Sequence, residues 1–482
     1  MRILVISTYE LGHQPLHAAA PAAGLRAAGH DVRVRDLAVE SWSDDHVVWA
    51  DAMACSVPMH TARRLAAEAT RRARFVDPTL HVCWFGLYAV AATPPPEDSI
   101  HLIAGEYDDA LCGWADDPVG STAGGPVVEI GRAPSTGRPV PDRADLPGLD
   151  QYVHFIDGNT STTVAAVEAS HGCAHRCRHC PVPVIYDGRT RPVDTTTVLA
   201  DIAQQVEAGA RHVTFGDPDF LNRPAHSLEI VREMRRRFND AGTDTLTFDC
   251  TVKVEHILRH RGVWEELAAS GCRFVVSAFE SADDTTLEIL DKGHTTTDAA
   301  EAVELLRSHG IEIRPSFLPF LPWTTPDDVV RLVDFVADND LVANVDPVQY
   351  TIRLLVPPGS LLLDVPELAD RLGDFDFVSH AWSWRALDPA VDELQAELAA
   401  IVEADVAAEV PILDTYRTVR AAVFSALGRA DCRAGERGAG MSATTAQLRD
   451  VPRLSESWFC CAEPTDAQWG ALTAVSPSST GR

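Results

Sequence analysis

Short apolar runs that alternate with helical stretches constrain the fold of this 482-residue chain more than any other feature. Between residues 1 and 115 the predicted strands are Ile3–Ser7, Asp31–Leu37, Val47–Val57, His81–Gly86 and Ser99–Ala104, with helices predicted at Pro15–Ala28 and Thr61–Arg74. Strands this short, separated by helices, predict a parallel sheet that is covered by helices.

A second alternating series follows. Its predicted strands are Val164–Ala169, His212–Gly216, Leu246–Val254, Arg273–Phe279, Glu312–Phe317 and Val348–Leu355. Six strands with helices between them predict a partial (β/α)6 barrel with its reactive groups at the C-terminal strand ends. The series spans about 195 residues, fewer than the ~250 of a closed eight-unit barrel.

These patterns divide the α/β chain into four parts. Residues 1–115 form the first α/β domain, and residues 116–162, rich in Gly, Pro, Ser and Asp, form a connection. Residues 163–357 form the partial barrel. Residues 358–482 are predicted to be mainly helical, with a cysteine-bearing tail.

The composition excludes some partners. Seventy acidic against forty-one basic side chains give a formal charge of −29, which repels nucleic acid and anionic lipid, although a local basic patch can still exist. No apolar run approaches the ~18 residues that cross a bilayer. Eleven cysteines with no export signal predict reduced thiols in the cytoplasm.

The sharpest motif is a cysteine triplet directly after the first barrel strand. Cys173, Cys177 and Cys180 have the spacing C-x3-C-x2-C. Cysteine thiolates are the usual ligands of iron–sulfur clusters, and three of them would leave one iron open to a substrate or cofactor. The alternative is a zinc knuckle that uses these cysteines with His175 or His179.

The triplet and the partial barrel, over about residues 163–357, resemble the radical S-adenosylmethionine (radical SAM) superfamily. The resemblance implies that the three cysteines hold a 4Fe-4S cluster and that S-adenosylmethionine chelates the fourth iron. One-electron reduction, from a donor such as flavodoxin or ferredoxin, then breaks a carbon–sulfur bond and makes a carbon radical that acts on a small-molecule substrate.

Several strand-end residues are candidates for binding S-adenosylmethionine. Asp217 or Asp219, after the second barrel strand, is predicted to accept a hydrogen bond from its ammonium group. Glu280 and Ser281 resemble the G-x-E-S segment of cobalamin-type relatives. Lys253 and Arg353 are further candidates. The alternatives are a helix cap or turn for the acidic residues and a structural ion pair for the arginine.

The first domain resembles the cobalamin-binding, Rossmann-type domain that precedes the barrel in one subclass of the superfamily. Relatives that use a histidine carry D-x-H-x-x-G after the first strand, whereas this chain reads Tyr9-Glu10-Leu11-Gly12-His13-Gln14-Pro15. Cobalamin binding therefore stays one possibility, and the alternative is a degenerate domain kept for packing or partner contact.

The sequence Cys460-Cys461-Ala462-Glu463-Pro464 resembles the tail of the CUAEP/CCAEP radical SAM group. Soft thiolates prefer soft acceptors. We therefore predict that Cys460 and Cys461 are catalytic and present a soft atom, such as arsenic, to a 3-amino-3-carboxypropyl or adenosyl radical. The alternatives are a cobalamin-dependent radical SAM methyltransferase and a non-catalytic iron–sulfur or zinc protein.

Overall fold

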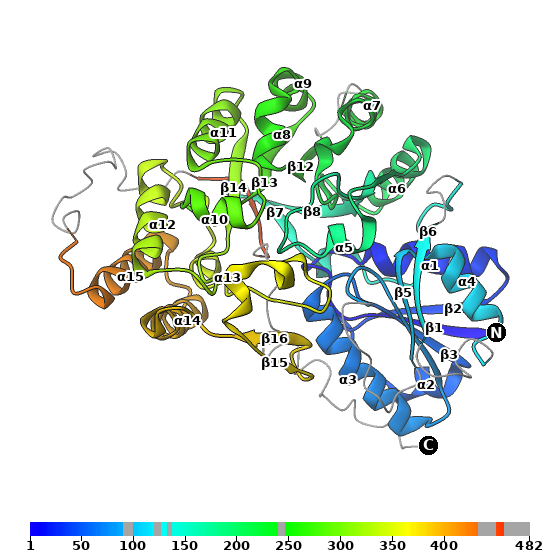
Figure 1. Ribbon diagram of the computed structural model, residues 1–482. Helices are drawn as coiled ribbons and strands as arrows, with labels where there is room; N and C mark the ends of the chain where they lie inside the picture. Colours follow the sequence, from blue (N-terminus) through cyan, green and yellow to red (C-terminus); the bar gives the residue numbers. More distant parts are fainter. Residues whose placement is uncertain (90–99, 120–126, 133–136, 240–245, 432–449, 457–482) are drawn as a thin grey trace.

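The computed structural model describes residues 1–89, 100–119, 127–132, 137–239, 246–431 and 450–456. None of the helices in these ranges is long and apolar enough to cross a membrane. Two parallel sheets organise the chain and lie beside each other (Figure 1).

The first sheet has six parallel strands in the order β2-β1-β3-β4-β5-β6. They are β1 (Arg2–Ser7), β2 (Asp31–Asp36), β3 (Ala52–Ser56), β4 (His81–Phe85), β5 (Ile100–Glu106) and β6 (Val127–Arg132). Ile3 and Val5 pack under α1 (Leu16–Ala27) and α4 (Asp108–Asp116), whereas Leu4 and Ile6 pack under α2 (Asp44–Trp49) and α3 (His60–Val76). Both faces of the sheet are covered by helices, so successive residues of the central strands are buried and their sequences are nearly continuously apolar.

Two details differ from the sequence prediction. The predicted strand Val47–Val57 is split, because Asp44 and Asp45 occupy the first turn of α2, where acidic residues favour a helix. The predicted connection also contains β6, which pairs in parallel with β5 over residues 127–132. Part of that segment therefore belongs to the first sheet.

The barrel consists of five parallel strands and an edge. The strands are β8 (Thr160–Val167), β11 (His212–Phe215), β12 (Thr247–Thr251), β13 (Cys272–Glu280) and β14 (Glu312–Phe317). On the β8 side the sheet is extended by the antiparallel strands β7 (His154–Asp157) and β17 (Arg453–Leu454). The outer layer contains α6 (Thr195–Glu207), α7 (Pro224–Met234), α8 (Val254–Arg259), α9 (Trp264–Ala269), α11 (Thr296–Ser308) and α12 (Pro326–Asp338) (Figure 1).

The sixth predicted strand, Val348–Leu355, is reduced to a single parallel bridge between Phe320 and Arg353. Pro347–Tyr350 forms a 3-10 turn instead. Pro347 has no N–H to give to a ladder, and the Gln349 side chain takes the Phe317 N–H at 2.9 Å. The partial α/β barrel is confirmed, with its last unit rudimentary.

The described residues after 358 are mainly helical, as predicted, and pack on the barrel. It contains α13 (Pro366–Ala369), α14 (Pro389–Ala407), α15 (Ile412–Ala426) and a hairpin of β15 (Leu372–Asp376) and β16 (Ala381–Trp384). Leu394, Leu398 and Val419 belong to the same apolar core as the barrel strands.

Arg143 fastens the two sheets to each other. Its buried guanidinium forms two bonds of 2.8 and 2.9 Å to Asp201 on α6. It also donates to Gln14 Oε1, next to the first sheet, at 3.0 Å and to the Ala166 carbonyl of β8 at 2.8 Å. A buried, charge-assisted network of this kind holds one relative orientation of the two sheets.

Candidate active site

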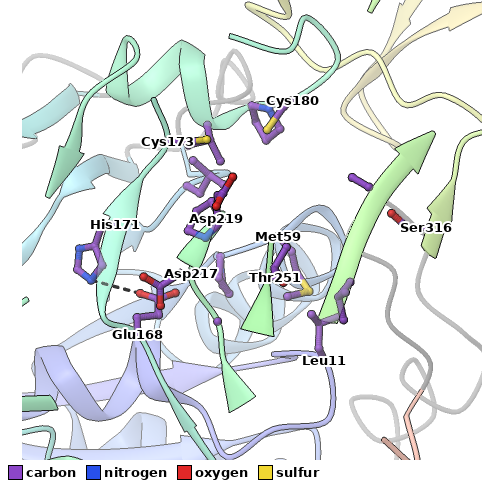
Figure 2. Close-up of a pocket in the computed structure, with 18 of the residues that line it drawn as sticks. Leu11, Met59, Glu168, His171, Cys173, Cys180, Asp217, Asp219, Thr251 and Ser316 are labelled. Carbon is purple, nitrogen blue, oxygen red and sulfur yellow. Dashed lines mark ion pairs between the residues drawn. The ribbon is translucent and has the colours of Figure 1, made fainter. Parts of the chain in front are cut away.

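One cavity of about 410 Å³ lies where the carboxyl ends of both sheets meet (Figure 2). Loops that follow strands of the first sheet line it with apolar side chains: Leu11, Pro58, Met59, Leu87 and Tyr88. The barrel contributes charged and sulfur-bearing side chains, among them Cys173, Cys177, Cys180, Asp217, Lys253 and Glu280. Carboxyl ends of parallel strands are the usual location of sites in such folds.

The cysteine triplet lies on one wall of this cavity, in the turn between β9 (Ser170–Gly172) and α5 (Val182–Tyr186). Gly172 has φ +73° and lies against the backbone of β10 (Thr190–Pro192), where a Cβ would come within 2.3 Å of the Arg189 carbonyl. The loop can therefore fold back only with glycine there. Burial raises the pKa of Cys173 to about 11, so the thiol needs a metal to become a thiolate at neutral pH.

Asp217 and Asp219 both line the cavity, but local contacts occupy their oxygens. Asp217 accepts from Ala169 N at 2.8 Å and from Ser170 Oγ at 2.6 Å, and burial raises its pKa to about 7. Asp219 Oδ1 caps a 3-10 turn by accepting from Leu221 N at 2.9 Å. The sequence left open a turn or cap role for these two residues, and the structure shows such local contacts for both Asp217 and Asp219.

Asp219 also joins two histidines beside the cysteine loop. Its Oδ2 is 2.9 Å from His256 Nδ1 and 3.7 Å from His175 Nε2. Such a group could hold a divalent ion. The Lys253 ammonium, however, is 3.2 Å from His175 Nδ1 and opposes a second cation there. Burial and this ammonium lower the pKa of His175 to about 3, so a neutral imidazole ties the loop to the barrel.

Glu280 closes β13 at a bulge and has φ +65°. Its Oε1 is 3.1 Å from His179 Nε2 and 3.1 Å from Lys292 Nζ. Burial alone would raise its pKa, but Lys292 and His179 outweigh burial and hold the pKa well below its usual range. A buried carboxylate is thus kept ionised beside the cysteine loop.

Ser281 and Arg353 do not line the cavity, and the structure does not support their predicted role in cofactor binding. Ser281 Oγ accepts from Asp283 N at 3.1 Å in a turn. Arg353 stacks 3.6 Å over the Trp384 ring, donates to the Trp384 carbonyl and pairs with Asp392 on α14. The alternative of a structural ion pair therefore describes Arg353.

A buried polar chain that the sequence did not reveal crosses between the two sheets. His17 Nδ1 is 2.9 Å from Tyr107 Oη, and His17 Nε2 is 3.1 Å from Glu168 Oε1. Glu168 in turn pairs with His171 at 3.2 Å (Figure 2). Burial would lower the pKa of His17, but Glu168 and Glu10 raise it to about 9. These residues come from separate segments, so no local motif announces them.

His13 lines the cavity from the loop after β1. Burial lowers its pKa to about 4, and the charged groups that act on it are Asp249, His212 and Arg143. At neutral pH His13 is therefore an uncharged imidazole. Cys460 and Cys461 lie outside the described residues, and so does the whole tail motif.

Comparison with known families matches this architecture. Residues 167–336 match the family model of the radical SAM superfamily. This stretch contains the cysteine triplet and the strand ends that line the cavity. The barrel of this chain is thus similar to the radical SAM domain over these residues, and the predicted resemblance is confirmed at this level.

Curated relatives are about a quarter identical to the chain over the segments that align. An uncharacterized methyltransferase of Pyrococcus horikoshii is 24% identical over 220 residues, which is 45% of this chain and 44% of the relative. The hopanoid C-3 methylase of Methylococcus capsulatus is 24% identical over 333 residues, or 64% of this chain and 62% of that enzyme. The chain spans less than half the length of the first curated relatives that it matches.

Two solved enzymes share the fold. The cobalamin-dependent S-adenosylmethionine radical enzyme OxsB superposes with a TM-score of 0.67 at 14% identity, covering 88% of this chain and 72% of that one. The radical S-adenosylmethionine methyltransferase TsrM of Kitasatospora setae, with cobalamin and a [4Fe-4S] cluster bound, gives 0.55 at 18% identity, covering 75% of this chain and 73% of that one. These likenesses confirm the predicted two-part fold, and the predicted cofactors are those of the family and its structural neighbours.

Proposed function

We propose that this chain is a cobalamin-dependent radical SAM enzyme that transfers a methyl group to a small molecule. A single observation carries the proposal: one cavity joins three cysteines on the barrel to an apolar rim on the first sheet. A cluster on the first wall and a flat macrocycle on the second would face the same space, as a two-cofactor transfer requires.

The cysteine wall fits a cluster, because the turn presents three thiols and no fourth cysteine of the described residues lines the cavity. When bound, a 4Fe-4S cluster supplies the electron that breaks a sulfonium carbon–sulfur bond. Lys253 and Glu280 are our candidates for contacting the charged groups of S-adenosylmethionine, since both are buried strand-end residues that line the cavity. Asp217 and Asp219 would hold the surrounding loops in place.

The opposite wall fits a corrin ring. Leu11, Pro58, Met59, Leu87 and Tyr88 form an apolar surface at the ends of β1, β3 and β4, and Glu10, His13 and His17 line the cavity from the same side. A flat, largely apolar macrocycle would remove these side chains from water. The loop that carries His13 does not match D-x-H-x-x-G, so we assign this histidine no bond to cobalt.

Methyltransferases and methylthiotransferases both match the chain, and we favour methyl transfer because the longest alignment given above is to a methylase. Both curated relatives described above are methyl-transferring enzymes by name, and TsrM is a methyltransferase with the same fold. Carbon–arsenic bond formation has no support from these comparisons. A separate electron donor is also part of the proposal, because the cluster chemistry requires one. A cytoplasmic location is part of it as well, and rests on the eleven cysteines.

The test begins with anaerobic reconstitution. We expect about four irons per chain, retention of hydroxocobalamin, and formation of S-adenosylhomocysteine or 5′-deoxyadenosine after reduction. Met59→Glu should weaken cobalamin retention by about ten- to a hundredfold, because a buried charge would face the ring. Met59→Leu is the matched control and should retain it. A wild-type protein that holds iron but never binds the corrin would contradict the cobalamin part alone.

We also propose that Cys460 and Cys461 contact the substrate. The described end of the chain supports this: Leu454 of β17 lines the cavity, and Tyr9 donates to Glu456 Oε1 at 2.7 Å. Cys460 follows Glu456 by four residues in the sequence. Replacing both cysteines with serine should abolish turnover and leave the iron content unchanged, whereas Cys112→Ser should change neither.

A further inference from the structure

Four arginines gather around the cysteine loop, and we call them the arginine patch: Arg176, Arg189, Arg191 and Arg223. Arg176 lies inside the loop, between Cys173 and Cys177. Arg189 and Arg191 flank Thr190 on β10, which pairs with β9 directly before the loop. Arg223 donates to Thr190 Oγ1 at 2.9 Å, so it lies beside the same strand.

Three of the four are not neutralised by the rest of the described protein. Arg189, Arg191 and Arg223 form no ion pair with the described residues, and Arg189 and Arg223 are exposed. Arg176 pairs with Asp187 at 2.9 Å, and both side chains are more than half exposed. The other nearby acid, Asp194, accepts a hydrogen bond from Gly137 N. Exposed arginines elsewhere have close acidic partners, such as Arg232 with Glu266 and Arg236 with Glu233.

The charge of the whole chain makes this patch unusual. At −29 the protein repels acidic proteins over most of its surface. A small electropositive area can still steer an acidic partner to one place and fix its orientation. Here that area surrounds the loop that presents the cysteines, whose Ala174 and Arg176 are exposed while Cys177 is buried.

We propose that the arginine patch is the docking surface for an acidic one-electron donor protein of the flavodoxin type. This deepens the proposed function, because it rests on a cluster at Cys173, Cys177 and Cys180. One electron passes from the reduced flavin to the cluster, so the donor is oxidised by one electron and the cluster is reduced by one. No bond forms between the two proteins.

Nucleic acid is the other acidic class that a patch could attract. Affinity for a nucleic-acid backbone grows with the number of phosphates that cationic side chains neutralise. Four arginines on a chain of this charge favour the compact protein donor, and RNA binding is therefore an outcome of the test.

The first experiment measures docking without any cluster chemistry. Oxidised flavodoxin is titrated into the reconstituted full chain by calorimetry at ~0.05 M and ~0.3 M salt, where screening differs strongly. Arg189→Gln/Arg223→Gln should weaken binding about tenfold at low salt, and high salt should remove the difference. Arg232→Gln/Arg236→Gln removes the same charge from α7 and the π-helical turn directly after it, and should bind like the wild type.

The second experiment measures electron transfer as bleaching of the cluster absorbance. Reduced flavodoxin should bleach the Arg189→Gln/Arg223→Gln cluster about tenfold more slowly than the wild-type cluster, and dithionite should bleach both at the same rate. Equal flavodoxin rates in both proteins, or binding of transfer RNA in place of flavodoxin, would overturn the docking proposal. Absence of any reducible cluster would instead overturn the proposed function.

Discussion

The first sheet and the barrel face the same cavity with different chemistry. The rim of the first sheet is mostly apolar, with Met59 and Tyr88 among its side chains beside Glu10, whereas the barrel wall carries three thiols and the buried charges of Lys253 and Glu280. Apolar walls bind by removing area from water, and charged walls bind by fixed partners. The loops at the two sets of strand ends therefore offer different surfaces, which under the proposed function would hold a corrin ring on one side and a cluster on the other.

The largest expected effect breaks the barrel wall alone. Cys177→Ala should reduce the iron content from about four per chain to near zero, because two thiolates cannot hold a cubane. Radical formation should disappear with it, while cobalamin binding at the other wall should survive. Iron analysis and visible spectra check both. Cys112→Ala, on α4 beneath the first sheet, should retain the iron. A cluster retained by Cys177→Ala would contradict the ligand assignment.

The next effect concerns stability in the barrel wall. Glu280→Gln leaves the Lys292 ammonium buried without its carboxylate and should cost about 3–5 kcal/mol in the free energy of unfolding. The double variant Glu280→Gln/Lys292→Met removes both charges and should recover most of that loss. Urea unfolding of the cofactor-free chain measures both variants. Equal stabilities for the two would show that the pair is not a buried ion pair.

A smaller effect tests the contact between the two sheets. Because the pKa of His17 is raised to about 9, its charged pairing with Glu168 stabilises the folded chain fully below about pH 6.5, and this stabilisation is lost as the pH rises through about 9. The difference in free energy of unfolding between wild type and His17→Gln should be on the order of 2 kcal/mol at low pH and should shrink by about pH 10. A difference independent of pH would mean that His17 contributes packing alone.

The two regions also differ in how far the sequence predicts them. The cysteine loop is contiguous, so the spacing of Cys173, Cys177 and Cys180 is enough to predict its chemistry. The partners of that loop are not contiguous with it: His256 and Lys292 are brought to it by the barrel closing, and neither lies in a motif. The apolar rim of the first sheet could not be predicted from a motif, because apolar contact depends on the area buried and not on particular residues.

Arg353 is a residue whose sequence position suggested a role that its contacts in the structure do not match. Its position at the predicted end of the sixth strand suggested cofactor binding, but that strand is one bridge long. With little strand to direct it into the barrel, the guanidinium packs on Trp384 and Asp392. Strand register determines where a side chain points, and a 3-10 turn at Pro347–Tyr350 changes that register.

The smallest expected effect follows from this placement. Arg353→Leu should lower the free energy of unfolding by only ~1 kcal/mol, the scale of an exposed cation–π contact, and should leave the binding of S-adenosylmethionine unchanged. Lys253→Leu is the matched comparison, because Lys253 is buried in the cavity, and it should weaken that binding by about tenfold or more. Equilibrium binding to the reconstituted protein separates the two. Loss of S-adenosylmethionine binding in Arg353→Leu would contradict this placement. It would mean that the last barrel unit contributes a side chain to the cavity.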